Sequence, residues 1–166
     1  MLAPLFLNLV ELQPGDAVFL DAGVPHAYLE GMGVELMANS DNVLRGGLTP
    51  KHVDVPELLR TIRFESAPVE RAAEQPGPGG ETVYRTPAAE FRLSGIRPEQ
   101  GRGYRSAERR SVEILLCVSG TARLKTLSGE ASQSLSLQPG ASVLIPAAAP
   151  AYLLEGRARL FKATVP

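Results

Sequence analysis

The sequence has 166 residues, and its 17 basic and 18 acidic side chains leave a net charge of −1. This balance argues against a nucleic-acid or anionic-membrane partner, and no apolar run approaches the roughly 20 residues that cross a bilayer. Hydrophobic residues make up 44 % and charged residues 21 %, so the chain can bury a core. The start lacks a basic region and a cleavage motif, which predicts no signal peptide. The single cysteine, Cys117, is expected to be a small buried hydrophobe in a cytoplasmic protein.

The first part of the chain alternates short apolar runs with turn signals. Turns are predicted at 13–16 and 21–25, where proline and glycine meet aspartate. Asp54 as an N-cap, with Pro56 in the first turn, predicts a short helix near 55–63. Around these signals the apolar runs predict four strands, at Leu5–Leu12, Ala17–Leu20, His26–Leu29 and Val34–Ala38.

Residues 67–82 are rich in proline and glycine and poor in apolar side chains, which predicts a linker or exposed loop. β signals return at Val83. Seven short runs follow, and they predict a mainly all-β fold of the sandwich or barrel type. The runs are Glu90–Ile96, Val112–Val118, Ala122–Thr126, Gln133–Leu137, Ser142–Ile145, Ala151–Leu154 and Ala158–Ala163.

One segment of the sequence occurs twice. The tetrapeptide Leu-Gln-Pro-Gly at 12–15 recurs at 137–140, and the offset of 125 residues holds without a gap over the next residues. Such a match in one register indicates duplication of a β unit. The same offset pairs His26 of the first copy with Ala151 of the second. It also pairs Val18 with Val143, Ala22 with Ala147, Pro25 with Pro150, Leu29 with Leu154 and Gly31 with Gly156.

The first copy resembles the second sequence motif of the cupin family. Gly15, Gly23 and His26 stand at the motif's spacing, and Asp21 replaces its usual proline. The resemblance implies a jelly-roll β-barrel in which His26 is a metal ligand at the barrel mouth. The other histidine, His52, has no such context and is expected to be a surface or structural residue.

The second copy departs from the motif at the residues that matter for a metal. Gly140 and Pro146 are kept, but Ala148 and Ala151 replace the second glycine and the histidine. The His-x-His of the first cupin motif is absent upstream of Glu113. Alanine has no lone pair to offer, so the second barrel is predicted to be metal-free.

Residues 35–51 form a dense polar block that ends on Arg45, a glycine pair and Lys51. Composition alone leaves two interpretations open: a solvated loop, or an anion-binding loop that grips a phosphate or an enediolate. Sequence motifs favour the second. The run PHAYLEGMGVELMANSDNVLRGGLTPK resembles the C-terminal part of type I mannose-6-phosphate isomerases (phosphomannose isomerases) over about residues 5–65.

That resemblance implies a zinc-dependent isomerisation of mannose 6-phosphate and fructose 6-phosphate through a cis-enediol. It implies that His26 binds zinc, that Arg45 steadies the enediolate and that Asp41 assists ring opening. A fixed cation and a carboxylate suit these two tasks. Three further side chains are implied to line the sugar-phosphate pocket, namely Tyr28, Glu35 and Lys51.

The sequence departs from the family before His26. The family's other zinc ligands, a Gln-x-His pair and a glutamate, have no counterpart there, and one histidine is a poor zinc site. We therefore expect residues 1–66 to be the C-terminal portion of a catalytic cupin barrel, 67–82 a linker and 83–166 a second barrel. As a C-terminal fragment or truncated homologue, the chain is expected to bind zinc weakly or not at all and to be inactive alone.

Two alternatives stay open. The chain could be a binding or regulatory module that keeps the sugar-phosphate loop without catalysis, or its metal site could be completed across an oligomer interface. A partial barrel also exposes strand edges and apolar faces. We expect residues 5–47 to be covered by a second copy of the chain, as a homodimer, or by the second barrel.

Overall fold

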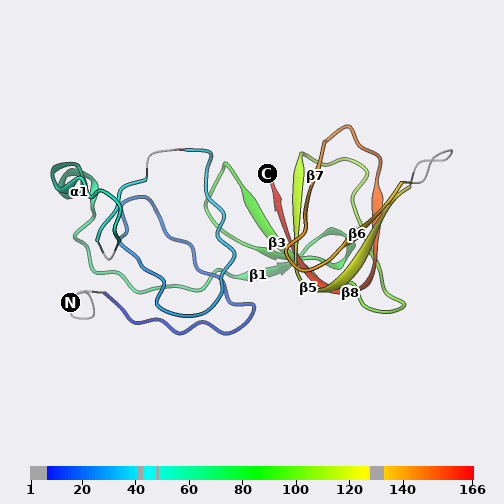
Figure 1. Cartoon of the computed structure of the whole chain (residues 1–166), viewed down its shortest axis with the longest axis horizontal. Coiled ribbons are helices and arrows are strands. Elements are labelled where there is room, and N and C mark those ends of the chain that lie inside the picture. Colours follow the sequence, from blue (N-terminus) through cyan, green and yellow to red (C-terminus); the bar gives the residue numbers. More distant parts are fainter. Residues whose placement is uncertain (1–6, 41–42, 48, 128–132) are drawn as a thin grey trace. The chain divides into compact units, whose positions relative to one another are not determined.

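The computed structural model describes residues 7–40, 43–47, 49–127 and 133–166. The chain divides into two compact units, Met1–Ala72 and Ala73–Pro166 (Figure 1). The second unit thus begins inside the stretch 67–82. Among the described residues, no helix is long and apolar enough to cross a membrane.

The second unit is an eight-stranded antiparallel sheet. Its strand order is β1-β2-β3-β8-β5-β6, with β4 paired to β8 and β7 paired to β5. This arrangement confirms the mainly β, cupin-type fold. The strands are β1 (Glu74–Pro76), β2 (Thr82–Tyr84), β3 (Arg92–Ile96), β4 (Tyr104–Arg105), β5 (Glu113–Thr126), β6 (Ser134–Leu137), β7 (Ser142–Ile145) and β8 (Tyr152–Thr164), with a 3-10 turn, η2, at Pro78–Gly80.

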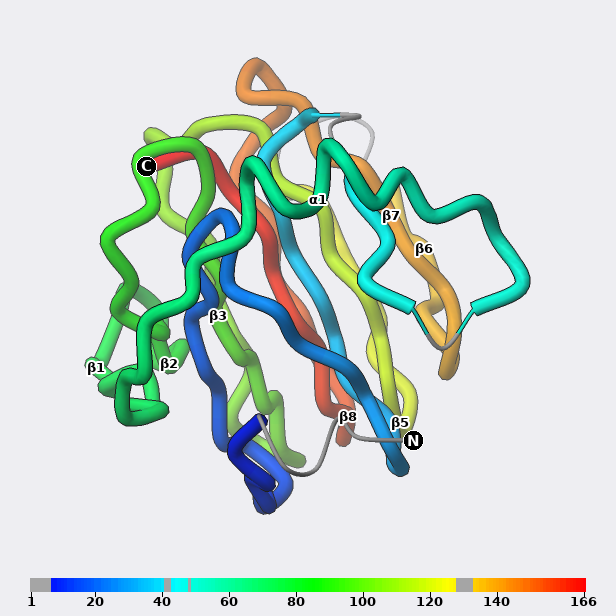
Figure 2. The backbone as a smooth tube through the Cα atoms, turned by 90° about the vertical axis from the view of Figure 1, so that its left-hand side faces the viewer, coloured from blue at the N-terminus to red at the C-terminus, as the bar shows by residue number. Residues whose placement is uncertain are grey.

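Two long strands, β5 and β8, form the centre of this sheet and lie side by side in both views (Figures 1 and 2). The sequence predicted each of them as two short strands, because a glycine interrupts each run. In the structure Gly120 and Gly156 take positive φ values of 71° and 124°, and pairing continues past both. A register shift between Cys117 and Ser119 absorbs the irregularity, as a β-bulge does.

The core of the protein lies in the second unit. Alternate residues of β5 and β8 point inward, so that the apolar members of both strands meet. Cys117 is fully buried, which confirms its prediction as a small core residue. The core comprises Ile96, Tyr104, Leu115, Cys117, Ala122, Leu124, Leu137, Ile145, Tyr152, Leu154 and Leu160.

The first unit contains one regular element among its described residues, the helix α1 (Val55–Thr61). Its start is as predicted: the Asp54 carboxylate accepts a hydrogen bond of 3.0 Å from the Glu57 backbone N–H, which satisfies one free donor of the first turn. The helix ends at Thr61, because the C-cap residue Ile62 has an extended backbone that leaves the helical path.

The four strands predicted for this unit are wrong as regular elements. Over their described residues the backbone forms only isolated bridges, such as that between Val18 and Arg71, and no described residue of the unit is buried. A strand requires a neighbour that accepts its hydrogen bonds. The described residues of this unit provide such a neighbour only around Ala17, whose carbonyl accepts from the Ala72 N–H at 2.8 Å.

Candidate functional site

The candidate site is built around the turn that precedes His26. The Val24 N–H donates to the Asp21 carbonyl at 3.2 Å, which closes the predicted turn. Arg63, just beyond α1, holds this turn by two contacts. Its N–H donates to the Gly23 carbonyl at 2.9 Å, and its guanidinium donates to the Asp21 carboxylate at 2.7 Å. The Arg63 hydrogen bond, and then that from the Ala22 N–H, lower the pKa of Asp21.

Gly23 is required for this close approach. Its φ of 82° lies in the left-handed region. A Cβ atom there would lie 2.7 Å from the Thr61 carbonyl oxygen, which is shorter than any ordinary contact. Asp21, which replaces the proline of the cupin motif, therefore has a structural explanation: its carboxylate binds Arg63, where a proline would only restrict φ.

The His26 ring is exposed, and a backbone carbonyl two residues before it orients the ring. Its Nδ1 lies 3.0 Å from the Val24 carbonyl oxygen. A carbonyl accepts only, so this contact fits the tautomer with hydrogen on Nδ1 and leaves the Nε2 lone pair available to a ligand. The ring packs edge-on to Tyr28, with 5.9 Å between centroids.

Tyr28 and Glu35 form the second part of the arrangement. The Tyr28 hydroxyl donates to the Glu35 carboxylate at 3.0 Å. Partial desolvation raises the pKa of Tyr28, and the carboxylate adds to the effect, so the phenol stays protonated. The structure thus brings together three of the predicted site residues: His26, Tyr28 and Glu35.

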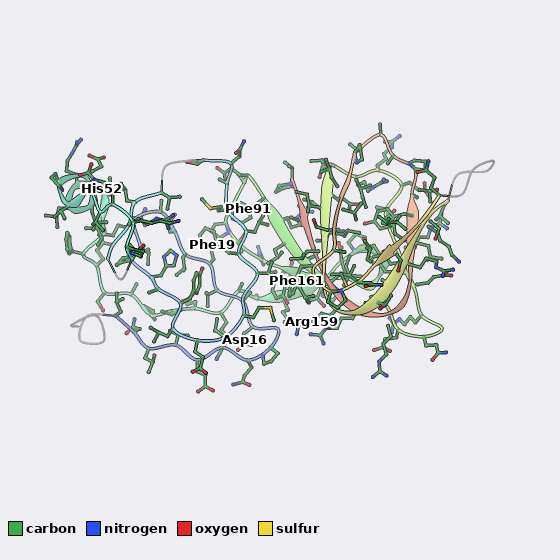
Figure 3. The ribbon with its side chains drawn as sticks, in the orientation of Figure 1. Asp16, Phe19, His52, Phe91, Arg159 and Phe161 are labelled. Carbon is green, nitrogen blue, oxygen red and sulfur yellow. The ribbon has the colours of Figure 1, made fainter. Side chains whose placement is uncertain are left out.

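Two other predicted residues have no described contact with this group. Arg45 and Lys51 are exposed, and the contact found for Lys51 among the described residues runs from its backbone N–H to the Thr49 hydroxyl at 3.2 Å. Asp41 lies outside the described residues. His52, which stands just before α1, is exposed, in agreement with a surface residue (Figure 3).

The described part of the chain contains no group of three or more His, Cys, Asp or Glu side chains that could hold a metal ion. Zinc sites use three or four protein ligands, so these residues do not by themselves fit zinc. Of the predicted site residues, His26 is the one that offers a metal a nitrogen ligand, through its Nε2 atom.

The second copy of the repeat keeps the turn and loses the histidine. The Ala149 N–H donates to the Pro146 carbonyl at 3.0 Å, which is the counterpart of the bond between Val24 and Asp21. Ala151, which corresponds to His26 in the sequence repeat, is 5 % exposed. Here Arg110 holds the turn, because its guanidinium donates to the Ala149 and Pro150 carbonyls at 2.7 and 2.9 Å.

Sequence reasoning missed a buried polar group inside the second unit. Glu113 accepts a hydrogen bond of 2.9 Å from the Tyr152 hydroxyl and lies 3.2 Å from Arg110 Nε. Lys162 is in the same interior. A signal for them exists in the sequence, because Glu113 and Lys162 have the inward phase of strands whose other inward residues are apolar.

Comparison with known proteins gives consistent matches. Residues 102–165 match the family model for the cupin domain of mannose-6-phosphate isomerase. Mannose-6-phosphate isomerase of Escherichia coli is 42 % identical over 161 residues, which is 96 % of this chain and 40 % of that protein. The protein of the same name from Mus musculus is 41 % identical over 121 residues, or 70 % of this chain and 29 % of the relative.

Solved structures agree with these matches. A single-residue mutant of phosphomannose isomerase from Salmonella typhimurium superposes with a TM-score of 0.83 at 38 % identity, covering 99 % of this chain and 42 % of that one. A zinc-bound mannose 6-phosphate isomerase superposes with a TM-score of 0.81 at 38 % identity, covering 99 % and 41 %.

The antiparallel fold and the family match place the second unit in the cupin class. Within that class the chain is a relative of the mannose-6-phosphate isomerases, which confirms the resemblance seen in the sequence. It spans about 40 % of the length of the curated bacterial relatives it matches.

Proposed function

We propose that this chain is part of a mannose-6-phosphate isomerase, which interconverts mannose 6-phosphate and fructose 6-phosphate by a zinc-dependent route through a cis-enediol. The observation that carries this proposal is the 42 % identity to the Escherichia coli protein over almost the whole chain. We assign residues 1–66 to the catalytic cupin barrel and the second unit, Ala73–Pro166, to a metal-free second barrel; the connection is then shorter than the predicted 67–82, because β1 begins at Glu74. We further propose that the protein acts in the cytoplasm.

The site residues are assigned by what their side chains can do. His26 offers Nε2 as one zinc ligand, since its Nδ1 is engaged with Val24. Tyr28 and Glu35 act as one hydrogen-bonded unit that binds sugar hydroxyls. Arg45 stabilises the negative charge of the enediolate, and its exposed guanidinium leaves its donors accessible to a substrate.

Two further roles complete the proposal. Asp41 assists opening of the sugar ring by proton transfer, and Lys51 binds the phosphate as a point charge. The other zinc ligands are proposed to come from residues outside the 166, because the described residues do not form a metal site by themselves. The isolated chain is therefore expected to bind zinc weakly and to leave mannose 6-phosphate unchanged.

Complementation tests this function. The chain is mixed with the portion of the Escherichia coli enzyme that it does not match, and conversion of mannose 6-phosphate is followed with and without zinc. We expect zinc-dependent turnover in the mixture and none from either part. Arg45→Ala should abolish it, and Arg60→Ala, which removes only an exposed ion pair to Glu57, should not. Chelator-sensitive turnover by the chain alone would contradict the proposed dependence on residues outside it.

A sugar-phosphate-binding or regulatory module is the second candidate. The exposure of His26, Tyr28 and Glu35 is the observation that favours it, because an exposed group suits binding more than catalysis in a closed site. Titration calorimetry with fructose 6-phosphate separates the two. Binding by the chain alone, together with failure of complementation, would favour the module.

We also propose that the exposed apolar side chains of the first unit are covered in a homodimer. Leu9, Leu29 and Met32 are 86 %, 74 % and 92 % exposed, which is more apolar surface than a monomer usually leaves open. Small-angle scattering across a concentration series tests this proposal. A monomer at every concentration would contradict it.

A further inference from the structure

The turn before His26 is joined to a residue far along the chain. Arg63 follows the helix α1 and lies 42 positions after Asp21, whose carboxylate accepts a hydrogen bond of 2.7 Å from its guanidinium. The Arg63 backbone N–H donates to the Gly23 carbonyl at 2.9 Å. One residue thus binds the turn at its first and third positions, so the end of α1 and the turn are held together.

The turn and the end of α1 also approach each other closely. A Cβ atom at Gly23 would lie 2.7 Å from the carbonyl oxygen of Thr61, the last residue of the helix, and 3.2 Å from Arg63 Cγ. The Ala22 N–H donates to one Asp21 carboxylate oxygen at 2.9 Å, and the guanidinium binds the other. Close approach of the backbone and directed hydrogen bonds therefore join the same two segments.

The carbonyl that orients the His26 ring belongs to this turn. The Val24 N–H donates to the Asp21 carbonyl at 3.2 Å, and the Val24 carbonyl oxygen lies 3.0 Å from His26 Nδ1. The hydrogen bond made by one ring nitrogen determines which nitrogen carries the proton and fixes the orientation of the ring. The orientation of His26 therefore depends on how firmly the turn holds the Val24 carbonyl.

The exposure of the pair formed by Asp21 and Arg63 indicates what the pair can do. The two side chains are 57 % and 50 % exposed, and an exposed ion pair contributes little to the stability of a fold. No described residue of the first unit is buried, and a segment with few buried contacts opens locally at low cost in free energy. Directed contacts such as this pair are therefore needed to keep the turn in one geometry.

We propose that Arg63 is a positioning residue for His26. It holds the turn that presents the Val24 carbonyl, and this carbonyl keeps hydrogen on Nδ1 and the Nε2 lone pair available to a ligand. No described contact joins Arg63 to the imidazole, so its effect passes through the turn. The use of Nε2 as a ligand position rests on the proposed function, whereas the state of the ring can be measured without it.

The tautomer of His26 tests this role in the full chain. Nitrogen-15 chemical shifts at about pH 9, where imidazole is neutral, give the share of each tautomer. His52, for which no ring hydrogen bond is found among the described residues, is the internal reference. We expect the Nδ1–H form to be favoured about five-fold more at His26 than at His52, as one ordinary hydrogen bond supports. Arg63→Gln should reduce this preference by about two- to five-fold, with little change in urea unfolding.

Three further variants make the result specific to this link. Asp21→Asn turns the oxygen that Arg63 binds into an amide donor and should reproduce the effect, and the double variant should add nothing, because both changes break one contact. Arg63→Lys keeps a cation beside Asp21 and should restore most of the preference. Arg71→Gln removes a similar exposed ion pair, to Asp16 at 2.9 Å in another turn of the same unit, and should leave His26 unchanged.

Turnover in the complementation mixture gives a second measurement. Arg63→Gln should lower kcat several-fold and leave the KM for mannose 6-phosphate unchanged, because a misplaced His26 affects the reacting geometry more than substrate binding. If the wild-type mixture shows no turnover, the proposed function fails, and the tautomer measurement still decides the role of Arg63.

Three results would overturn the proposal. The first is a folded Arg63→Gln variant whose His26 tautomer is that of the wild type. The second is an equal loss of the preference in Arg71→Gln, which would show a general loosening of the unit. The third is a wild-type His26 ring with the same tautomer ratio as His52. If Arg63→Gln does not fold, Asp21→Asn is judged by the same criteria.

Discussion

Gly120 lies inside the long strand β5 and pairs with Ala158 of β8, and its replacement by alanine gives the sharpest test of the fold. Its φ of 71° is one that L side chains rarely adopt. A Cβ atom at this position would lie 2.1 Å from the Arg157 carbonyl oxygen and 2.8 Å from the Ala158 Cα, both on the paired strand β8. Backbone atoms cannot rotate away as a side chain can, so the two central strands would have to separate locally.

The expected loss of stability has two parts. The left-handed backbone costs about 1–2 kcal/mol for alanine, and overpacking against backbone costs about 1–3 kcal/mol. Alanine returns about 0.4–1 kcal/mol by restricting the unfolded chain. Gly120→Ala should therefore lower the free energy of unfolding by about 1–5 kcal/mol. Gly140→Ala isolates the first part, because Gly140 has a φ of 85° and open space around a Cβ, so about 1 kcal/mol is expected.

Urea unfolding followed by circular dichroism measures both variants against the wild type. An unchanged slope with a shifted midpoint would show that the free energy of unfolding, and not the compactness of the unfolded state, has changed. The reasoning is refuted if Gly120→Ala and Gly140→Ala differ by less than about 0.5 kcal/mol, since the close contact would then be relieved without cost.

Buried residues of the second unit give three more predictions. Tyr152→Phe removes the hydroxyl that donates to Glu113 at 2.9 Å and should cost about 1.5–3 kcal/mol by urea unfolding, whereas Tyr28→Phe, at an exposed hydroxyl, should leave the second unit unchanged. Burial raises the pKa of the Cys117 thiol, so alkylation by iodoacetamide at pH 8 should become rapid only in denaturant; rapid labelling of the native chain would contradict its burial. The pKa of Lys162 is raised in the folded protein, so its charge contributes stability that is fully present below its ordinary pKa of 10.5 and is lost as the pH rises through the folded value. An alkaline titration followed by circular dichroism should therefore show unfolding above pH 10.5. The unfolding should depend less steeply on pH in Lys162→Met.

Several features of the protein could be predicted from the sequence because they depend on neighbours along the chain. The helix at Val55–Thr61 starts where Asp54 and Pro56 predicted it, and the strands at 134–137 and 142–145 follow their apolar runs closely. The duplicated turn is local too: it is closed by a hydrogen bond between residues three apart in both copies. The resemblance to mannose-6-phosphate isomerases was also readable, since it rests on consecutive residues.

The tertiary structure decided whatever depends on partners distant in the chain. The runs at 17–20 and 26–29 have the pattern of strands, but a strand forms only where a neighbour accepts its hydrogen bonds, and no regular one forms there. Arg63 reaches Asp21 across 42 residues, which no local pattern reports. From its residue type alone, Lys162 would be expected at the surface. Only the pairing of β8 with β3 and β5 turns it inward, where the carboxylates of Glu81 and Glu113 determine what it does.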